Sequence, residues 1–360
     1  MRLLLLLASG AILFAQSASL TVVQGSASRN PTAGAVAHVW ADANTATRLF
    51  DGWTGGVQYL LDPAAWHTTL IMPAAAVNLS ATYRAVPSWT PSVGIFNGIS
   101  VTYTIPANPI GLIFDFHGTG GTGANQFAST EFLDFIREAV AAGFAVAAFD
   151  CLDRTTGQWN TSISGPANPD TVRLNGVIQA MRTQGLISPR LPLFAAGHSN
   201  GGTYAHFSSP VMSCAAVSIS CAYGSFLAAP LYNGPVIWQI ATNDDHPLVG
   251  PKGNADALSN YETQANRRNA GRLIILEPQP LCPARFAREP GITVADSQEI
   301  FNVFQSYGWL DANDMLRQNP TTFNWRAALP TRFSSVVQSS IERQIDVTST
   351  THEFPAKPAR

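Results

Sequence analysis

A serine between glycines is the first group in this 360-residue chain whose setting favours chemistry. Ser199 lies in the segment 197–202 (Gly-His-Ser-Asn-Gly-Gly), which fits the pattern Gly-x-Ser-x-Gly. An apolar run at 193–196 precedes this segment, and small residues that suit a helix follow it. A serine on such a strand-to-helix turn projects its hydroxyl above a sheet, where it can attack a carbonyl carbon. The alternative interpretation is a glycine-rich turn with an incidental serine.

A serine hydroxyl is a weak nucleophile, so it needs a base that a third group orients. In folds with this turn, the order along the chain is serine, acid, histidine. Asp244 follows an apolar run and is the predicted acid, with Asp245 as the alternative. His352 is the predicted base, because His246 lies too close to Asp244 in the sequence. The alternative for His352 is an ordinary surface histidine.

Backbone N–H groups would have to stabilise the negative oxygen that forms when Ser199 attacks. The segment 117–121 (His-Gly-Thr-Gly-Gly) follows an apolar run and is typical of an oxyanion loop. The predicted donors are the N–H of Thr119 or Gly120 in this loop and the N–H of Asn200 at the start of a helix. A phosphate-binding loop is excluded, because no Gly-Lys-Ser or Gly-Lys-Thr follows.

Three other histidines lie in or near these motifs. His117 is expected to anchor the oxyanion loop and to border the substrate. His198 is expected to pack against the serine turn, and His206 to lie on a face of the helix that follows.

Alternating strands and helices must position these groups. Apolar runs predict strands at 111–116, 144–149, 193–196, 216–220, 236–241 and 273–276. Apolar residues at helical spacing predict helices around 132–140, 174–181 and 337–345. Ser129 or Thr130 is expected to cap the first of these helices and Asp170 the second. The alternation indicates an α/β fold, a mainly parallel sheet with helices on both faces, whose ligands bind at the carboxyl ends of the strands.

The composition excludes several classes of function. The chain is 46% hydrophobic and 12% charged, with a formal net charge of -2, whereas about 25% charged is usual. This excludes a phosphate-neutralising surface for nucleic acid and also wholesale disorder. The cysteines allow three pairings, among which the sequence does not choose; they are Cys151, Cys214, Cys221 and Cys282. Their spacing is not that of a zinc site, and no metal or organic cofactor is implied.

Residues 1–17 are predicted to be a signal peptide. Arg2 is followed by an apolar run that is too short to span a bilayer, and small residues come next, near Ser17. We therefore expect a secreted protein, extracellular or periplasmic, without a membrane span. The alternative is a buried N-terminal strand.

Residues 20–86 are predicted to form a separate, small all-β module. Polar and apolar residues alternate along 77–83, as in a half-buried strand, and glycines mark turns. Three segments resemble the bacterial surface repeat of the internalin B-repeat type; they are 50–55, 68–74 and 77–83. The resemblance implies a spacer or adhesion module that contacts a cell surface or polysaccharide, with Trp53 and Met72 in its core.

Residues 87–360 resemble an α/β-hydrolase of the secreted polyhydroxybutyrate-depolymerase and feruloyl-esterase type. The resemblance covers most of 95–280 and rests on 117–121, Trp159, the helix near Asp170 and 197–202. It implies hydrolysis of carboxylic esters through an acyl-enzyme, on aryl or acetyl esters of polysaccharide or on polyesters. It also implies that Trp159 forms a wall of the substrate pocket; the alternative is an aromatic residue packed at the surface.

The stretch between Glu277 and His352 is longer than in that family. Within it, residues 278–330 contain helical runs and several aromatic residues, which predict an insertion. This insertion is expected to be a lid over the pocket or an outer buttress. Two other classes of function stay open: a serine peptidase, and a cell-surface binding protein in which the hydrolase fold is inert.

Overall fold

The computed structural model describes residues 18–352 except 30, 164 and 248, so the predicted signal peptide lies outside the described residues. The chain forms two compact units. The smaller unit takes in the described residues up to Asp42 together with Phe50–Arg84, and the larger takes in Ala43–Leu49 and the described residues from Ala85 onward. Among the described helices, none is long and apolar enough to cross a membrane.

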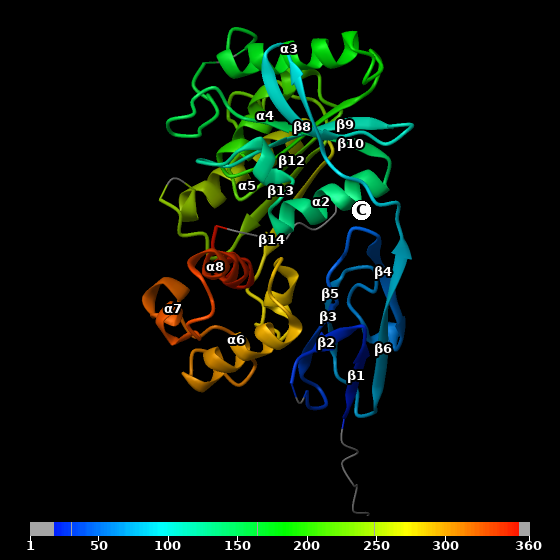
Figure 1. Ribbon diagram of the computed structural model, residues 1–360, viewed down its shortest axis with the longest axis vertical. Coiled ribbons are helices and arrows are strands. Elements are labelled where there is room, and N and C mark those ends of the chain that lie inside the picture. The colour runs from blue at the N-terminus through cyan, green and yellow to red at the C-terminus, as the bar shows by residue number, and fades with distance from the viewer. Residues whose placement is uncertain (1–17, 30, 164, 248, 353–360) are drawn as a thin grey trace, which may run out of the picture. The chain divides into compact units, whose positions relative to one another are not determined.

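The smaller unit consists of two three-stranded sheets (Figure 1). One sheet has the order β1 (Leu20–Val23), β6 (Val77–Ala85), β4 (Arg48–Gly55), and the other has the order β2 (Gly25–Ala27), β3 (Val36–Ala41), β5 (His67–Ile71). A short 3-10 helix, η1 (Val57–Tyr59), follows β4. The hydrophobic core of this unit includes Trp53 and Met72. The prediction of a small all-β module is confirmed.

The larger unit is built on an eight-stranded sheet. Its strands are β7 (Ser92–Phe96), β8 (Ile99–Thr104), β9 (Gly111–Phe116), β10 (Phe144–Phe149), β11 (Leu193–His198), β12 (Ala216–Ser220), β13 (Val236–Ala241) and β14 (Gly271–Leu276). They lie in the order β14-β13-β12-β11-β9-β10-β8-β7. All neighbours from β14 to β10 pair in parallel, and β8 pairs antiparallel with both β10 and β7. The predicted mainly parallel sheet is confirmed.

Helices cover both faces of this sheet (Figure 1). They are α1 (Gly123–Gln126), α2 (Thr130–Ala141), α3 (Pro169–Thr183), α4 (Asn200–Met212) and α5 (Gly250–Asn266). Side chains alternate along β9: Leu112 and Phe114 join a core with residues of α3, α4 and α5, whereas Ile113 joins a second core with residues of α2. β9 is therefore buried on both faces, which is why its residues are apolar apart from Asp115, whose Oδ2 accepts a hydrogen bond from Gln126.

The start of α3 differs from the prediction. Its N-cap is Asn168, whose side chain accepts a hydrogen bond from the Thr171 N–H, and Pro169 is the first helical residue. The expected cap, Asp170, instead accepts hydrogen bonds from the N–H groups of Leu152 and Asn160. Aspartate and asparagine are similarly good caps, so the sequence pattern alone does not separate Asp170 from Asn168; a cap at Asn168 leaves proline at its preferred first helical position.

The C-terminal part of the larger unit is helical. It contains η2 (Arg285–Arg288), α6 (Val294–Ser306), η3 (Pro320–Thr322), α7 (Trp325–Ala328) and α8 (Ser335–Ser349). η2, α6, α7 and α8 share a hydrophobic cluster that includes Phe304, Trp325 and Ile341. Because α8 packs into this cluster, the cluster determines where the chain lies directly after α8, at His352.

Candidate active site

Ser199 occupies a tight turn between β11 and α4. Its backbone has φ 54 and ψ -127, a conformation that an L residue adopts only when the surroundings impose it. Glycines make this turn possible: a Cβ on Gly197 would lie 2.4 Å from the Gly201 carbonyl oxygen, and a Cβ on Gly201 would lie 2.1 Å from the carbonyl oxygen of Phe116. The sequence pattern around Ser199 therefore corresponds to a real strand-to-helix elbow.

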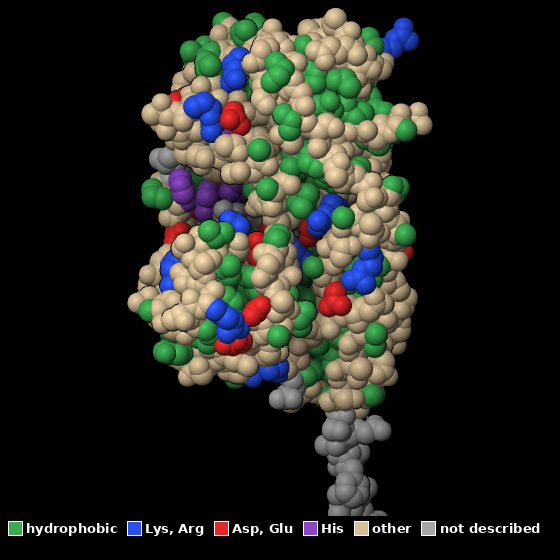
Figure 2. Space-filling view, viewed as in Figure 1, with side chains coloured by type: hydrophobic (Ala, Val, Ile, Leu, Met, Phe, Trp, Pro, Cys, Tyr) green, Lys and Arg blue, Asp and Glu red, His purple; other side chains and the backbone are tan. Residues whose placement is uncertain are grey.

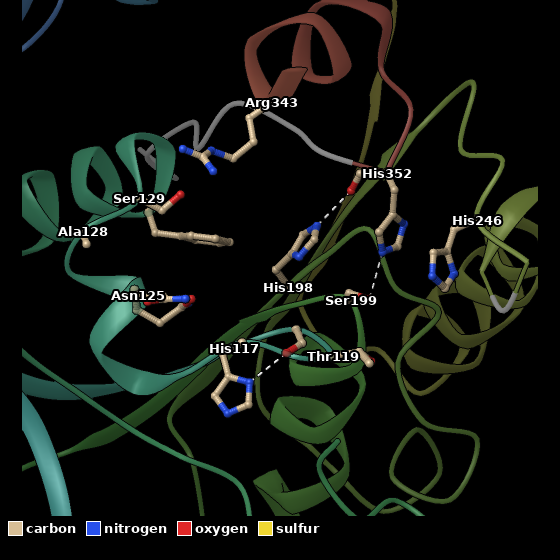
Figure 3. Close-up of a pocket in the computed structure, with 14 residues that line it drawn as sticks. His117, Thr119, Asn125, Ala128, Ser129, His198, Ser199, His246, Arg343 and His352 are labelled. Atoms are coloured by element: carbon tan, nitrogen blue, oxygen red, sulfur yellow. Dashed lines mark hydrogen bonds between the residues drawn. The ribbon is translucent and has the colours of Figure 1, made fainter. Parts of the chain in front are cut away.

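Ser199, His352 and Asp244 form a chain of hydrogen bonds (Figure 3). The Oγ of Ser199 lies 2.8 Å from Nε2 of His352, and Nδ1 of His352 lies 3.0 Å from Oδ2 of Asp244. Asp244 is buried, and its other oxygen accepts the His246 N–H at 3.0 Å. This arrangement lets the imidazole accept the serine proton while the carboxylate holds the opposite ring nitrogen. The alternative acid, Asp245, is exposed and accepts a hydrogen bond from Asn319 instead.

The loop that carries Asp244 is hydrogen-bonded to the end of α8, the helix that precedes His352. The Asn243 N–H donates to the Thr350 carbonyl at 3.0 Å, and the Asn243 side chain donates to the Ser349 carbonyl at 3.0 Å. The His198 ring nitrogen Nε2 lies 2.8 Å from the His352 carbonyl oxygen. These contacts hold the backbone next to Asp244 and at His352, although the partners lie more than a hundred positions apart in sequence.

The oxyanion loop lies directly beside the elbow. A Cβ on Gly118 would lie 3.3 Å from the Ser199 Cβ, a tight contact that brings this loop close to the nucleophile candidate. The Gly120 N–H donates to the Gly157 carbonyl at 3.2 Å, so Gly120 is not available as a donor and that expectation is corrected. The N–H groups of Thr119 and Asn200 have no hydrogen-bond partner within the described part of the chain, which leaves these two as candidate donors.

His117 anchors this loop, as expected. It is buried, its Nδ1 lies 2.7 Å from the Gly118 carbonyl oxygen, and its Nε2 accepts the Cys151 N–H at 3.2 Å. Burial lowers the pKa of His117, which keeps the ring neutral and able to accept. His117 also lines the cavity described below.

Trp159 does not line the cavity. Its side chain is 2% exposed and packs against the rings of Phe116, Phe149 and Tyr204. Its Nε1 donates to the His117 carbonyl at 2.9 Å, and its backbone N–H donates to the Asn200 side chain at 2.6 Å. Trp159 is thus neither a pocket wall nor a surface residue: it is a core residue beneath the oxyanion loop.

A cavity of about 440 Å³ opens beside Ser199. Figure 2 shows histidine side chains gathered in a hollow on the face that it presents. The side chains of Phe132, Arg343 and His246 contribute to the lining in addition to the residues of the elbow and the oxyanion loop. No described residue of the insertion 278–330 lines the cavity. The lining therefore gives no support to a lid, and that role of the insertion stays a prediction.

His246 is a residue of the site that the sequence did not single out. Its ring stacks on the His352 ring, with centroids 4.3 Å apart and planes at 23° (Figure 3). Burial and the adjacent His352 lower the pKa of His246. His246 lies two residues after Asp244, which is why the sequence did not predict it to be the base. The same closeness to Asp244 places the His246 ring against the ring of His352.

Within the described ranges, no three His, Cys, Asp or Glu side chains are arranged to hold a metal ion. The thiols of Cys151 and Cys214 are buried and unpaired, and Cys221 and Cys282 are buried as well.

Residues 16–87 match the family model of the divergent InlB B-repeat domain, which confirms the resemblance of the N-terminal module. No curated protein sequence matches the chain. The solved structures that are similar to this chain have low sequence identity to it and TM-scores of about 0.4. An acetyl xylan esterase from Aspergillus awamori is 13% identical at a TM-score of 0.39, over 49% of this chain and 81% of that chain. A dienelactone hydrolase from Anabaena variabilis is 17% identical at a TM-score of 0.39, over 61% and 99%.

A third similar structure is an acylaminoacyl peptidase from Pyrococcus horikoshii, 10% identical at a TM-score of 0.40, over 82% of this chain. The present chain spans half of the length of that peptidase. The sheet order and the elbow at Ser199 give the larger unit an α/β-hydrolase fold on its own geometry.

Proposed function

We propose that this protein is a serine hydrolase that cleaves carboxylic esters through an acyl-enzyme. The observation that carries the proposal is the 2.8 Å contact between Ser199 Oγ and His352 Nε2, with the opposite nitrogen of His352 held by Asp244. The cavity beside Ser199 gives an ester access to the hydroxyl.

In the first half of the reaction, His352 accepts the proton of Ser199 while the serine oxygen attacks the ester carbonyl carbon. Asp244 holds the imidazole in the tautomer that accepts at Nε2 and stabilises the imidazolium that forms. The N–H groups of Thr119 and Asn200 are the proposed donors to the oxyanion. The imidazolium then protonates the departing alcohol oxygen, which leaves Ser199 acylated.

In the second half, His352 accepts a proton from water, and the resulting nucleophile attacks the acyl-enzyme carbonyl carbon. Collapse of that intermediate releases the acid, and the proton returns from His352 to Ser199. Each half uses the same oxyanion donors, because the negative oxygen forms at the same position.

The location and substrates of the protein are also proposals. The composition of residues 1–17 supports secretion to the extracellular space or periplasm. The family match of residues 16–87 supports a module that contacts a cell surface or polysaccharide. Aryl or acetyl polysaccharide esters and polyesters are the proposed substrate classes.

Substitution of the nucleophile tests the proposal. Ser199→Ala is expected to lower the kcat for p-nitrophenyl acetate by at least about 10⁴-fold, because removal of a triad member leaves only the oxyanion donors and binding. A fluorophosphonate probe should label the wild type at Ser199. Ser339→Ala, which removes an exposed hydroxyl on α8, serves as the control and should keep both properties. Retained turnover in Ser199→Ala contradicts the proposal.

A further inference from the structure

Arg343 carries the one permanent charge among the described residues that line the cavity. We propose that Arg343 selects esters that bear a carboxylate a few bonds from the scissile carbonyl. This inference rests on the proposed ester hydrolysis and adds the substrate class to it.

Hydrogen bonds hold the guanidinium of Arg343 in place, but not all of its N–H groups have a partner among the described residues. It projects from α8 toward the cavity (Figure 3). Its Nη2 donates to the Ser340 hydroxyl at 3.1 Å and to Glu289 at 3.4 Å. Its Nε is buried and has no hydrogen-bond partner among the described residues. Because Nε itself is covered, a ligand oxygen entering the cavity would meet the terminal nitrogens of the guanidinium instead.

The interaction of Glu289 with Arg343 is longer than its interaction with Gln344. The closest partner of Glu289 is Gln344, whose Nε2 donates to Oε1 at 2.6 Å, and Arg343 reaches the other oxygen at the longer distance of 3.4 Å. The Glu289 side chain is 1% exposed, whereas that of Arg343 is 39% exposed. Glu289 therefore holds the guanidinium from its buried side, and the Arg343 side chain contributes to the lining of the cavity.

The other described residues that line the cavity are compatible with a bound anion. Within the described residues no Asp or Glu side chain lines the cavity, although Glu289 lies behind Arg343. Ser129, the N-cap of α2, lines the same cavity, and its hydroxyl makes no capping bond to its helix. Phe132, one turn further along α2, supplies an apolar surface for the carbon chain between the two ends of a substrate.

These groups define the ligand chemically. Arginine binds carboxylates with two parallel N–H···O bonds, which are short and strong because both partners are charged. The carboxylate can belong to the acid part of the ester or to the alcohol part, and the two cases require different probes. The competing explanation is that Arg343 only neutralises Glu289, in which case the charge of the substrate has no influence.

Matched pairs of esters test the inference. For the acid part, the pair is mono-p-nitrophenyl glutarate and p-nitrophenyl valerate, which differ by a carboxylate in place of a methyl group. For the alcohol part, the pair is 4-carboxyphenyl acetate and 4-methylphenyl acetate. The quantity measured is the ratio of kcat/KM for the anionic ester to that for the neutral ester.

In Arg343→Gln we expect this ratio to fall roughly tenfold or more for one of the two pairs, mainly through KM, because a charge-assisted hydrogen bond is lost. Arg343→Lys should recover part of the ratio, and added NaCl should lower the wild-type ratio. Arg326→Gln is the matched control: Arg326 also pairs with a carboxylate, that of Glu342 on α8, but does not line the cavity, and the ratio should stay at the wild-type value.

Ser129→Ala keeps the pair of Arg343 with Glu289 intact and should also lower the ratio, so the inference stays testable if Arg343→Gln does not fold. Equal ratios in the wild type and both variants overturn the inference, as does an equal loss of activity toward both members of each pair. If turnover of the neutral esters still depends on Ser199, only the selection by Arg343 has failed. If turnover does not depend on Ser199, the proposed function itself has failed.

Discussion

His206 is a buried histidine outside the proposed catalytic group whose ionisation is tied to folding. It is fully buried on α4, and its Nδ1 accepts the Ser225 N–H at 3.1 Å. Burial lowers its pKa to about 3, from an ordinary value of 6.5. Protonation of Nδ1 would break the bond to Ser225 and place a charge inside the core, so the folded state excludes the proton.

Acidification should therefore favour unfolding through His206. Between pH 6.5 and about 3 the unfolded chain binds a proton that the folded chain does not. The free energy of unfolding should fall by up to about 1.4 kcal/mol per pH unit in this window from this group. In His206→Gln, whose side-chain oxygen can still accept from Ser225, denaturant titrations should give a shallower dependence on pH. Identical slopes in the two proteins would contradict this assignment.

The residues of the site differed in how well the sequence predicted them. The sequence singled out the three side chains that lie within hydrogen-bond distance in the structure, because the elbow pattern and the order serine, acid, histidine restrict the choice; their roles stay a prediction. Gly120 and Trp159 could not be assigned in this way. Whether an N–H is already bonded, or a ring is covered on all sides, depends on segments far away in sequence.

At the scale of elements, a buried network of charges joins α8 to α2 through η2. Arg288 donates to Asp134 at 2.9 Å and to Glu131 at 3.3 Å, and Gln344 on α8 donates to Glu131 at 3.1 Å. Burial opposes the charged form of Glu131, yet the positive charges of Arg288 and Arg285 hold its pKa below the ordinary value. The network therefore helps to fix α8, and α8 leads to His352.

Removal of one member of this network should be costly. Arg288→Met leaves two buried carboxylates without their main partner and should lower the free energy of unfolding by about 3–5 kcal/mol. The control is Arg332→Met, because Arg332 pairs with Asp296 and Glu299 at the surface, where ion pairs contribute little. Urea unfolding of the two variants measures the difference. Equal stability of both variants would show that the network does not hold α8.

Elements were predicted best where burial on both faces forces an apolar run, as in β9, β10, β12 and β13. The β7–β8 hairpin was not predicted from the sequence, because neither strand is a continuous apolar run: β7 contains Ser and Gly, and β8 alternates apolar and polar residues. Asn97 and Gly98 form the turn of this hairpin, with φ of 51 and 74. Asn-Gly is the strongest short hairpin motif, so this pair was the sequence signal for the hairpin. The cap of α3 was misplaced by two residues, since Asn and Asp have similar preferences for the position.

At the scale of the whole molecule, the chain has two units with separate hydrophobic cores. Trp53 packs edge-on against Phe50 in the core of the smaller unit, and its Nε1 donates to the Ala65 carbonyl at 2.9 Å. Ser199, Asp244 and His352 all belong to the larger unit. The stability of the smaller unit and ester turnover should therefore respond to different substitutions.

Trp53→Ala should destabilise the smaller unit by about 3–5 kcal/mol, because it removes a large buried ring and one hydrogen bond. Calorimetry should show one transition shifted to lower temperature, while kcat/KM for p-nitrophenyl acetate stays at the wild-type value. Trp325→Ala, in the cluster that holds α8, should have the opposite pattern and reduce turnover. Loss of ester turnover in folded Trp53→Ala would contradict the independence of the two units.

The long stretch between Ser199 and His352 also affects how the proposed active site forms during folding. Ser199 and His352 are 153 positions apart, and Asp244 and His352 are 108 apart. Contacts across such separations close large loops and form slowly compared with helices and neighbouring strands. After dilution from denaturant, the far-UV circular dichroism signal should therefore recover before ester hydrolysis does. A refolding intermediate with most of its sheet assembled would not yet hydrolyse esters.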